Sequence, residues 1–324
     1  MNTFSTVDQL WHYAARQTML FGERVDSRNG GSRELIGASY ALETTDYTFL
    51  TNATRGLSPS YAAAETLWYL SGSNTAEMLL AYAPSYMHYL TPEGIAHGAY
   101  GYRWAQFNQF RKVIDELKTE KNSRRAVMTC WRVDDDLGNA SSRDLPCTLS
   151  LQFLLRGNKL HLVVTMRSND LWLGMPYDIF AFTAIQRLMA EALDVDTGTY
   201  THNVGSLHIY DKNEEKVQSV ISDAPTSSAN TVFRSGNGLA RLESALGLEI
   251  MARQQRFEQC KPSSFVDLAT AELRSNTTTL ALVLMAASRW MYDWPERLTK
   301  QALREAFSDI VPPHLARLIV ERMK

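Results

Sequence analysis

Hydrophobic and polar positions change their spacing along the chain, which divides it into three regions. In the first region apolar residues recur with helical spacing, which predicts helices over 7–21, 59–71, 75–83 and 103–118. In the middle region short β-type runs predict strands over 126–133, 148–156, 159–167 and 199–210, with a buried helix over 179–193. The last region predicts helices over 239–256 and 265–289, and one or two more over 296–323.

The connecting segments complete the expected architecture. Residues 24–37 are rich in Gly, Ser and Arg and predict a loop, while Gly157-Asn158 predicts a tight hairpin turn. A polar stretch after residue 213 predicts a surface excursion. We therefore expect an α/β (α+β) fold with a mixed sheet, helix 179–193 packed against it and extra C-terminal helices. Residues 1–213 would form the core, and 214–324 a divergent, helical continuation of the same domain.

Composition narrows the class of protein. A net charge of −2 and a pI near 6.4 disfavour binding to a nucleic-acid polymer. Cys130, Cys147 and Cys260 have no spacing typical of disulfides or zinc sites, so we expect no metal and a reducing cytoplasm. The N-terminal residues do not resemble a signal peptide, and no long apolar run predicts a membrane span. The expected location is cytoplasmic, or the host cytoplasm for a phage protein.

One cysteine stands out by its neighbours. A lone cysteine at a strand start is more often core filler than a nucleophile. However, Cys147 begins one arm of the predicted hairpin and Arg167 ends the other, so the two should lie side by side. A guanidinium there would lower the thiol pKa and could also hold a phosphate. Arg124-Arg125, which open the preceding strand, would suit either a solvated surface or the same phosphate cradle.

An ordered set of motifs resembles the thymidylate synthase superfamily. The set lies within residues 8–213 and consists of Glu65-x-Leu67-Trp68-Tyr69-Leu70, Tyr100-Gly101-x-x-Trp104, Ser123-Arg124-Arg125, Pro146-Cys147, Arg167-Ser168-x-Asp170, Leu173-Gly174-x-Pro176-Tyr177-Asp178-Ile179 and His208-Ile209-Tyr210. The resemblance implies a thymidylate synthase-like fold, a homodimer, and one-carbon transfer to C5 of a pyrimidine nucleotide from 5,10-methylenetetrahydrofolate.

The resemblance also implies roles for individual residues. Cys147 would add to C6 of the base and make C5 nucleophilic, Tyr100 would remove the C5 proton, and Glu65 would organise waters and relay protons. The phosphate would be held by Arg28, Arg124, Arg125, Arg167 and Ser168, with Arg124 and Arg125 reaching the site of the partner subunit. Arg24 and Arg33 compete with Arg28 for this role.

The remaining implied roles concern the sugar and the folate. His208 and Tyr210 would bind the 3′-hydroxyl, and their spacing places both on one face of a strand. Asp170 would bind the folate pterin, and Gly174 lies in the same folate-side motif. An alternative for Asp170 is a loop aspartate that turns the chain before Leu171.

Several positions depart from thymidylate synthase itself. Asp178 occupies the position of an asparagine that reads uracil, and a carboxyl there suits the N4 amino group of cytosine. The family histidine after the nucleophile is Thr148, and the glutamine before the arginine is Met166. The segment before Tyr100 lacks the tryptophans that shield the site in the family's methylases. Their absence would admit water to the site. The closest resemblance is thus to deoxycytidylate and cytidylate 5-hydroxymethyltransferases.

Alternatives remain open at this point. The favoured reading is a hydroxymethyltransferase of dCMP, because Ser168 follows the pattern of enzymes for deoxynucleotides. The others are a CMP hydroxymethylase, a C5-methylase of dCMP or dUMP, and, least favoured, a non-catalytic relative that binds nucleotide or RNA.

Overall fold

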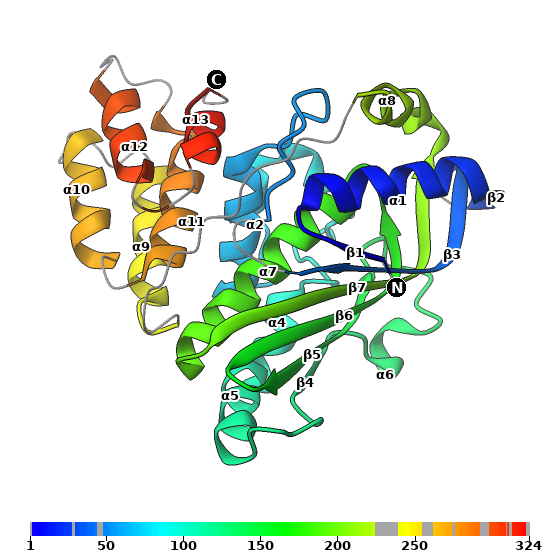
Figure 1. Ribbon diagram of the computed structural model, residues 1–324, viewed down its shortest axis with the longest axis horizontal. Helices are drawn as coiled ribbons and strands as arrows, with labels where there is room; N and C mark the ends of the chain where they lie inside the picture. The colour runs from blue at the N-terminus through cyan, green and yellow to red at the C-terminus, as the bar shows by residue number, and fades with distance from the viewer. Residues whose placement is uncertain are drawn as a thin grey trace.

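A seven-stranded mixed sheet forms the centre of the described part of the protein (Figure 1). The computed structural model describes residues 2–27, 30–43, 48–223, 239–254, 262–273, 276–291, 298–308, 310 and 313–321. The strands are β1 (Asn2–Phe4), β2 (Glu23–Ser27), β3 (Gly30–Leu42), β4 (Val127–Thr129), β5 (Thr148–Arg156), β6 (Lys159–Asp170) and β7 (Asp196–Tyr210). Their order is β1-β3-β7-β6-β5-β4, with β2 also on β3, and only the β1–β3 and β6–β7 pairs are parallel.

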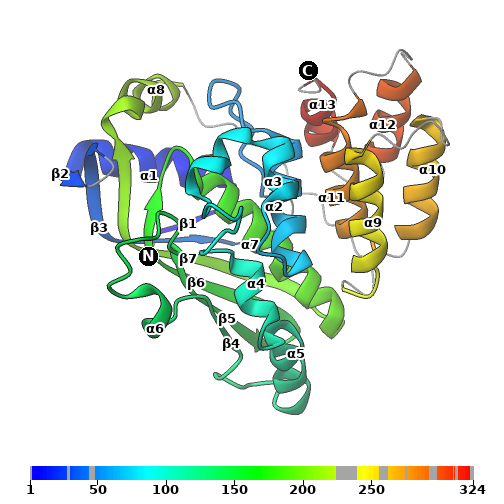
Figure 2. The same ribbon diagram turned by 180° about the vertical axis from the view of Figure 1, so that it is seen from behind.

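Helices cover one face of this sheet and form a second group beside it (Figure 2). The elements are α1 (Val7–Phe21), α2 (Pro59–Ser71), α3 (Glu77–Tyr82), the 3₁₀ helix η1 (Pro84–Tyr89), α4 (Tyr100–Ala105), α5 (Gln109–Thr119), α6 (Val133–Asp136), α7 (Gly174–Leu193), α8 (Asp211–Ile221), α9 (Leu242–Arg253), α10 (Pro262–Leu273), α11 (Thr277–Ala287), α12 (Leu298–Ser308) and α13 (Pro313–Glu321). Helix α7 packs on β6 and β7, α2 packs on α7, and α11 packs on α2. Among the described helices, none is both long and apolar enough to cross a membrane.

The predicted mixed sheet with a helix packed on it is confirmed. The residues of β5, β6 and β7 alternate between buried and partly exposed, so one face of the sheet lies under helices and the other is less covered. Apolar side chains such as Leu151, Leu162 and Val164 occupy the covered face. Ser150, Gln152 and Thr165 are partly exposed on the opposite face, a distribution typical of a sheet that is covered by helices on one side only.

Helix α2 forms over the predicted residues, and its ends explain why. The Ser58 side chain accepts a hydrogen bond from the Tyr61 N–H, Pro59 lies in the first turn, and Gly72 follows with a left-handed φ of 68°. These are the usual start and stop signals of a helix.

The loop predicted over 24–37 is wrong. This stretch forms β2 and most of β3, except for Arg28 and the following residue, which lie outside the described residues. Its composition favours turns, but β3 gains partners on both sides from β2, β1 and β7, and such pairing outweighs local preference. Gly37 lies between Ile36 and Ala38 in a β3–β7 register that does not shift, and its φ of 72° is a conformation that glycine adopts readily.

Two helix predictions and the start of the predicted excursion also need correction. The helix expected over 103–118 is two helices, α4 and α5, because Asn108 between them adopts a left-handed φ of 50°. The helix expected over 265–289 is likewise two, α10 and α11, and the side chain of Asn276 caps the second. The excursion expected after 213 begins with α8 instead, whereas 224–238 lie outside the described residues.

Candidate active site

Cys147 and Arg167 lie side by side, as the hairpin predicted. The strands β5 and β6 are antiparallel around Gly157, and the Arg167 N–H donates to the Cys147 carbonyl at 2.8 Å. The Arg167 guanidinium approaches Cys147 Sγ at 3.7 Å from Nη2 and is held by the carbonyls of Pro146 at 2.9 Å and Leu145 at 3.1 Å. Its two backbone contacts fix the guanidinium beside the thiol.

The thiol pKa differs from the expectation. Burial raises the pKa of Cys147 to about 11, and the charges of Asp178, Asp144 and Asp170 act in the same direction. Arg167 does lower the pKa, as predicted, but by less than burial raises it. In the free protein at neutral pH, Cys147 is therefore a protonated thiol.

Glu65 lies in α2 with its side chain turned toward the same region. The Tyr61 hydroxyl donates to Glu65 Oε1 at 2.8 Å. Burial raises the pKa of Glu65 to about 8, and the charge of Asp178 adds to this effect, while bonds from Tyr61 and Tyr69 oppose it. A carboxyl with this pKa can both give and take a proton near neutral pH.

Tyr100 reaches the site because α4 and α2 pack backbone to backbone. A Cβ at Gly101 would collide with the carbonyl of Tyr69, so only glycine permits this approach. The rings of Tyr69 and Tyr100 are 5.1 Å apart, and the Tyr100 ring stacks on Phe182 at 6.3 Å. Burial and the charges of Cys147 and Asp178 raise the pKa of Tyr100 well above its usual range.

Asp178 is buried at the start of α7. Its Oδ2 accepts a hydrogen bond from Asn169 Nδ2 at 2.8 Å, and Asn169 belongs to the adjoining β6. Burial raises the pKa of Asp178 to about 7, the charge of Asp170 adds to the effect, and the bond from Asn169 opposes it. Asp178 is thus poised between its neutral and ionised forms at neutral pH.

The predicted sugar and folate residues gather at the ends of β6 and β7. Asp170 and His208 are register partners, and the rings of His208 and Tyr210 are 4.9 Å apart. Asp170 Oδ1 accepts from the N–H groups of Trp172 at 2.8 Å and Leu173 at 3.1 Å. Asp170 therefore shapes the turn before α7, in line with the alternative considered for it.

Two further predicted residues flank this group. Ser168 pairs with Ser206 of β7, directly after Arg167. Gly174 lies beside the Asn169–Asp178 bond, since a Cβ there would come within 3.1 Å of Asn169 Nδ2. A side chain at Gly174 would therefore crowd the carboxyl of Asp178.

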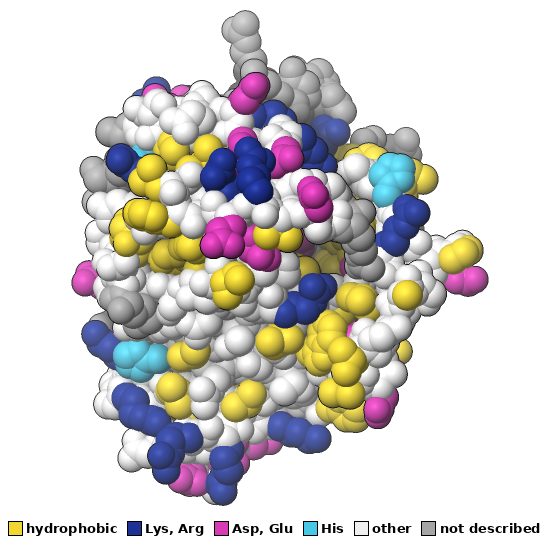
Figure 3. All heavy atoms as spheres, turned by 90° about the vertical axis from the view of Figure 1, so that its right-hand side faces the viewer, with side chains coloured by type: hydrophobic (Ala, Val, Ile, Leu, Met, Phe, Trp, Pro, Cys, Tyr) yellow, Lys and Arg dark blue, Asp and Glu magenta, His cyan; other side chains and the backbone are white. Residues whose placement is uncertain are grey.

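The candidate phosphate arginines have different surroundings. Arg24 and Arg33 are paired with acids of α8: Arg24 with Asp211 and Glu214, and Arg33 with Glu214 at 3.1 Å. Basic and acidic side chains lie side by side on the face shown in Figure 3. Acids of α8 therefore contact both Arg24 and Arg33 in this conformation. Arg28 lies outside the described residues.

The pair at β4 does not join the Cys147 group within one chain. Arg124 and Arg125 are exposed, and Arg125 forms ion pairs with Glu116 at 2.9 Å and Glu120 at 2.7 Å. Both glutamates belong to, or directly follow, α5.

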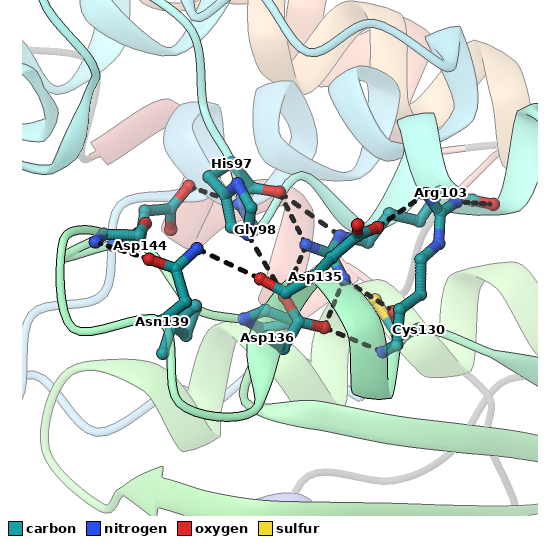
Figure 4. A network of polar contacts seen from close by, with 12 residues as sticks. His97, Gly98, Arg103, Cys130, Asp135, Asp136, Asn139 and Asp144 are labelled. Atoms are coloured by element: carbon teal, nitrogen blue, oxygen red, sulfur yellow. Dashed lines mark hydrogen bonds and ion pairs between the residues drawn. The ribbon is translucent and has the colours of Figure 1, made fainter.

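A buried polar network fixes the segment that leads to Cys147 (Figure 4). Arg103 of α4 binds both oxygens of Asp136 at 2.6 and 2.8 Å and the Cys130 carbonyl at 3.0 Å. Asp144 accepts from the Gly98 N–H at 2.8 Å. Burial opposes ionisation of Asp136, but the hydrogen bonds from Arg103, the Arg132 N–H and His97, together with the charge of Arg103, outweigh it and lower its pKa. The network ties the segment before Cys147 to the helix that carries Tyr100.

Sequence reasoning missed several residues of this site. The phenols of Tyr61 and Tyr69 surround Glu65, and Asn169 contacts Asp178. The sequence held one sign of a further polar contact, because Tyr200 and His202 are polar residues at positions of β7 that are buried. In the described ranges, no group of three His, Cys, Asp or Glu side chains is arranged to hold a metal ion.

The chain belongs to the thymidylate synthase family. The family model described as thymidylate synthase matches residues 11–244, further than the last motif at Tyr210. The chain is 31% identical over 177 residues to a thymidylate synthase of Francisella philomiragia subsp. philomiragia, a match covering 50% of this chain and 65% of the relative.

A second kind of relative is named after a different reaction. The chain is 32% identical over 219 residues to a deoxyuridylate hydroxymethyltransferase of Pseudomonas phage M6, which covers 65% of this chain and 62% of the relative. A thymidylate synthase of Francisella tularensis subsp. holarctica is 30% identical over 177 residues. The matches thus cover slightly less than two thirds of each relative.

Proposed function

We propose that this protein is a pyrimidine nucleotide C5-hydroxymethyltransferase that converts dCMP to 5-hydroxymethyl-dCMP with 5,10-methylenetetrahydrofolate. The observation that carries the proposal is Asp178, a buried carboxyl with a pKa near 7 beside the candidate nucleophile. A neutral carboxyl offers one donor and one acceptor, which complement N3 and the N4 amino group of cytosine. A mismatched base would leave a buried polar group unpaired.

The catalytic group consists of Cys147, Tyr100 and Glu65. The Cys147 sulfur forms a bond to C6, and the electron pair of the C5–C6 double bond makes C5 a nucleophile. Folate supplies the methylene that becomes bonded to C5. Tyr100 takes the C5 proton while the bond between the methylene and the folate nitrogen breaks, so that tetrahydrofolate leaves and an exocyclic methylene remains on C5. The oxygen of water then adds to this methylene, and the Cys147 sulfur leaves C6 as the C5–C6 double bond reforms. Glu65, with a pKa near 8, supplies and accepts protons in these steps.

The remaining side chains would bind the substrates. Arg167 and Ser168 hold the phosphate, together with Arg28, and the exposed Arg124 and Arg125 reach the partner's site in a homodimer. His208 and Tyr210 bind the 3′-hydroxyl. Asp170 fits the folate pterin because Oδ1 is used by backbone N–H groups while the carboxyl keeps a second oxygen, and Gly174 leaves room beside it.

Release of a hydroxymethyl product requires access of water. The 3₁₀ helix η1 lines the region of Glu65, and the Tyr86 ring packs on Trp68 at 6.0 Å. Met87, His88 and Tyr89 of the same helix are exposed. This wall has no tryptophan at η1, and we expect it to admit water, which favours water addition over hydride transfer.

A second candidate is the same reaction on dUMP. It is favoured by the similarity to the phage M6 protein, which is named for that substrate. Methylation of dUMP follows in turn from the thymidylate synthase relatives. CMP in place of dCMP is the remaining alternative, since Ser168 is our argument for the deoxyribose sugar.

The test is mass spectrometry of products from dCMP, CMP and dUMP, each incubated with methylenetetrahydrofolate. We expect a hydroxymethyl product from dCMP and no dihydrofolate absorbance, because only methylation oxidises the folate. Cys147→Ala serves as the control for uncatalysed reaction. A methyl product, or a preference for dUMP, contradicts the proposal.

A further inference from the structure

A series of hydrogen bonds links three buried side chains to Asp178. The Tyr200 hydroxyl lies 2.8 Å from His202 Nδ1, and His202 Nε2 lies 2.9 Å from Asn169 Oδ1. Asn169 Nδ2 then donates to Asp178 Oδ2 at 2.8 Å. Tyr200 and His202 are fully buried in β7, and Asn169 is nearly so in β6. The series therefore runs from the interior of the sheet to the candidate active site.

The direction of each hydrogen bond follows from the carboxyl. Because Asp178 Oδ2 accepts, Asn169 turns its amide N–H toward Asp178 and its oxygen toward His202. That oxygen accepts from His202 Nε2–H, so Nδ1 is unprotonated and accepts from the Tyr200 hydroxyl. Burial lowers the pKa of His202 to about 3, which keeps the ring neutral with a single N–H. Every donor thus points toward Asp178.

We propose that Asn169, His202 and Tyr200 are positioning residues that set base preference by determining which oxygen of Asp178 carries a proton. The inference rests on the proposed role of Asp178 in reading the base. Since Oδ2 already accepts the Asn169 N–H, a proton is placed best on Oδ1. Asp178 then offers a donor at Oδ1 and an acceptor at Oδ2.

This fixed pattern separates the two bases. With Oδ1 toward N3, cytosine presents an acceptor to Oδ1 and its N4 amino donor to Oδ2. Uracil in the same orientation presents N3–H to the donor and O4 to the acceptor, which is a mismatch at both contacts. Oδ2 has room for the second donor, because a carboxyl oxygen has two lone pairs.

The experiment compares dCMP and dUMP in direct competition for wild type, Asn169→Leu and Tyr200→Phe. We expect the kcat/KM ratio of the two nucleotides to move toward one, by about tenfold or more for Asn169→Leu and by about threefold to tenfold for Tyr200→Phe. Tyr82→Phe is the matched control, since the Tyr82 hydroxyl also donates to another side chain, Glu249 of α9 at 3.0 Å, but contacts none of Asn169, His202 and Tyr200. Its ratio should stay within about twofold of wild type.

A second measurement does not depend on activity. Nitrogen-15 NMR of histidine reports which ring nitrogen carries the proton. We expect a neutral His202 protonated at Nε2 in wild type, and a changed Nδ1 signal in Tyr200→Phe. A proton on Nδ1, or a charged ring, overturns the proposal even if Asn169→Leu fails to fold.

The outcomes separate this inference from the proposed function. If wild type prefers dUMP, the cytosine assignment fails and the inference fails with it, because the fixed donor and acceptor of Asp178 would mismatch uracil at both contacts. If wild type prefers dCMP and both variants keep its ratio, the positioning role fails and the proposed function stands. An equal loss of activity on both nucleotides, with the ratio unchanged, indicates a structural role only and also overturns the inference.

Discussion

Replacing Asp178 by asparagine removes a carboxyl that is unfavourable to ionise in the free protein. Burial raises its pKa from 3.8 to about 7, so the folded state binds a proton more tightly than the unfolded state. Its contribution to stability is complete below about pH 4 and is lost as the pH rises through about 7. Asn169 can still donate to an amide oxygen at this position, so the asparagine keeps that hydrogen bond.

The magnitude follows from the pKa difference. Each pKa unit corresponds to about 1.4 kcal/mol, so full ionisation of Asp178 costs roughly 4 kcal/mol of unfolding free energy as an upper limit. At pH 5 the carboxyl is mostly ionised in the unfolded state but still protonated in the folded state, so we expect Asp178→Asn to be more stable than wild type by at most roughly 1.7 kcal/mol. At pH 9 the variant should be more stable by about 2–4 kcal/mol.

The assay is urea unfolding without nucleotide at pH 5, 7 and 9, at one protein concentration. Asp136→Asn is a matched control of opposite sign, because Asp136 is a buried ion-pair partner of Arg103 with a lowered pKa. It should lose about 3–5 kcal/mol at neutral pH. An Asp178→Asn variant that is less stable than wild type at pH 9, or a difference that does not change with pH, would refute the reasoning.

The Asp178→Asn variant should also shift its substrate preference from dCMP toward dUMP. We expect the kcat/KM ratio of dCMP to dUMP to fall by on the order of 10²-fold or more, since two buried hydrogen bonds are mismatched at roughly 1–3 kcal/mol each. Increased stability with loss of activity on dCMP would mark Asp178 as a residue kept for function at a cost in stability.

Three other outcomes follow from the site. Cys147→Ala should abolish turnover but bind dCMP within about tenfold of wild type, and residual turnover above about a thousandth would contradict its role. In a Cys260→Ser background, alkylation of Cys147 should be slow at pH 7. The rate should rise about tenfold per pH unit toward pH 10, because the pKa of the thiol is near 11. A rate that is already maximal at pH 7 would show that Cys147 is a thiolate. Light scattering at micromolar concentration should give a dimer, and a monomer would argue against a phosphate site completed by Arg124 and Arg125.

The parts of the fold that sequence predicted are those with local signals. Ser58 and Pro59 mark the start of helix α2, and Gly72 marks its end. The turn at Gly157-Asn158 predicts the hairpin that brings Cys147 beside Arg167. The strand β3 was missed because its stability comes from β7, which is distant along the chain. Local composition carries no information about such a partner.

The same distinction applies to the candidate site. The positions of Cys147, Glu65 and Asp178 could be predicted because motifs mark them. The raised pKa of the thiol could not, since it depends on how the folded chain excludes water from the sulfur. The link from Tyr200 to Asn169 crosses between two strands whose side chains meet only in the folded sheet.

The packing of α11 on α2 has a consequence for synthesis of the chain. The helix that carries Glu65 is completed at Ser71, but the apolar side chains of α11 that cover it begin at Thr277, roughly 200 residues later. During translation, α2 must wait for that partner while most of the protein emerges from the ribosome. Until then the face of α2 that α11 covers stays exposed, whereas the partners of Glu65, namely Tyr61, Tyr69 and Asp178, are synthesised long before α11.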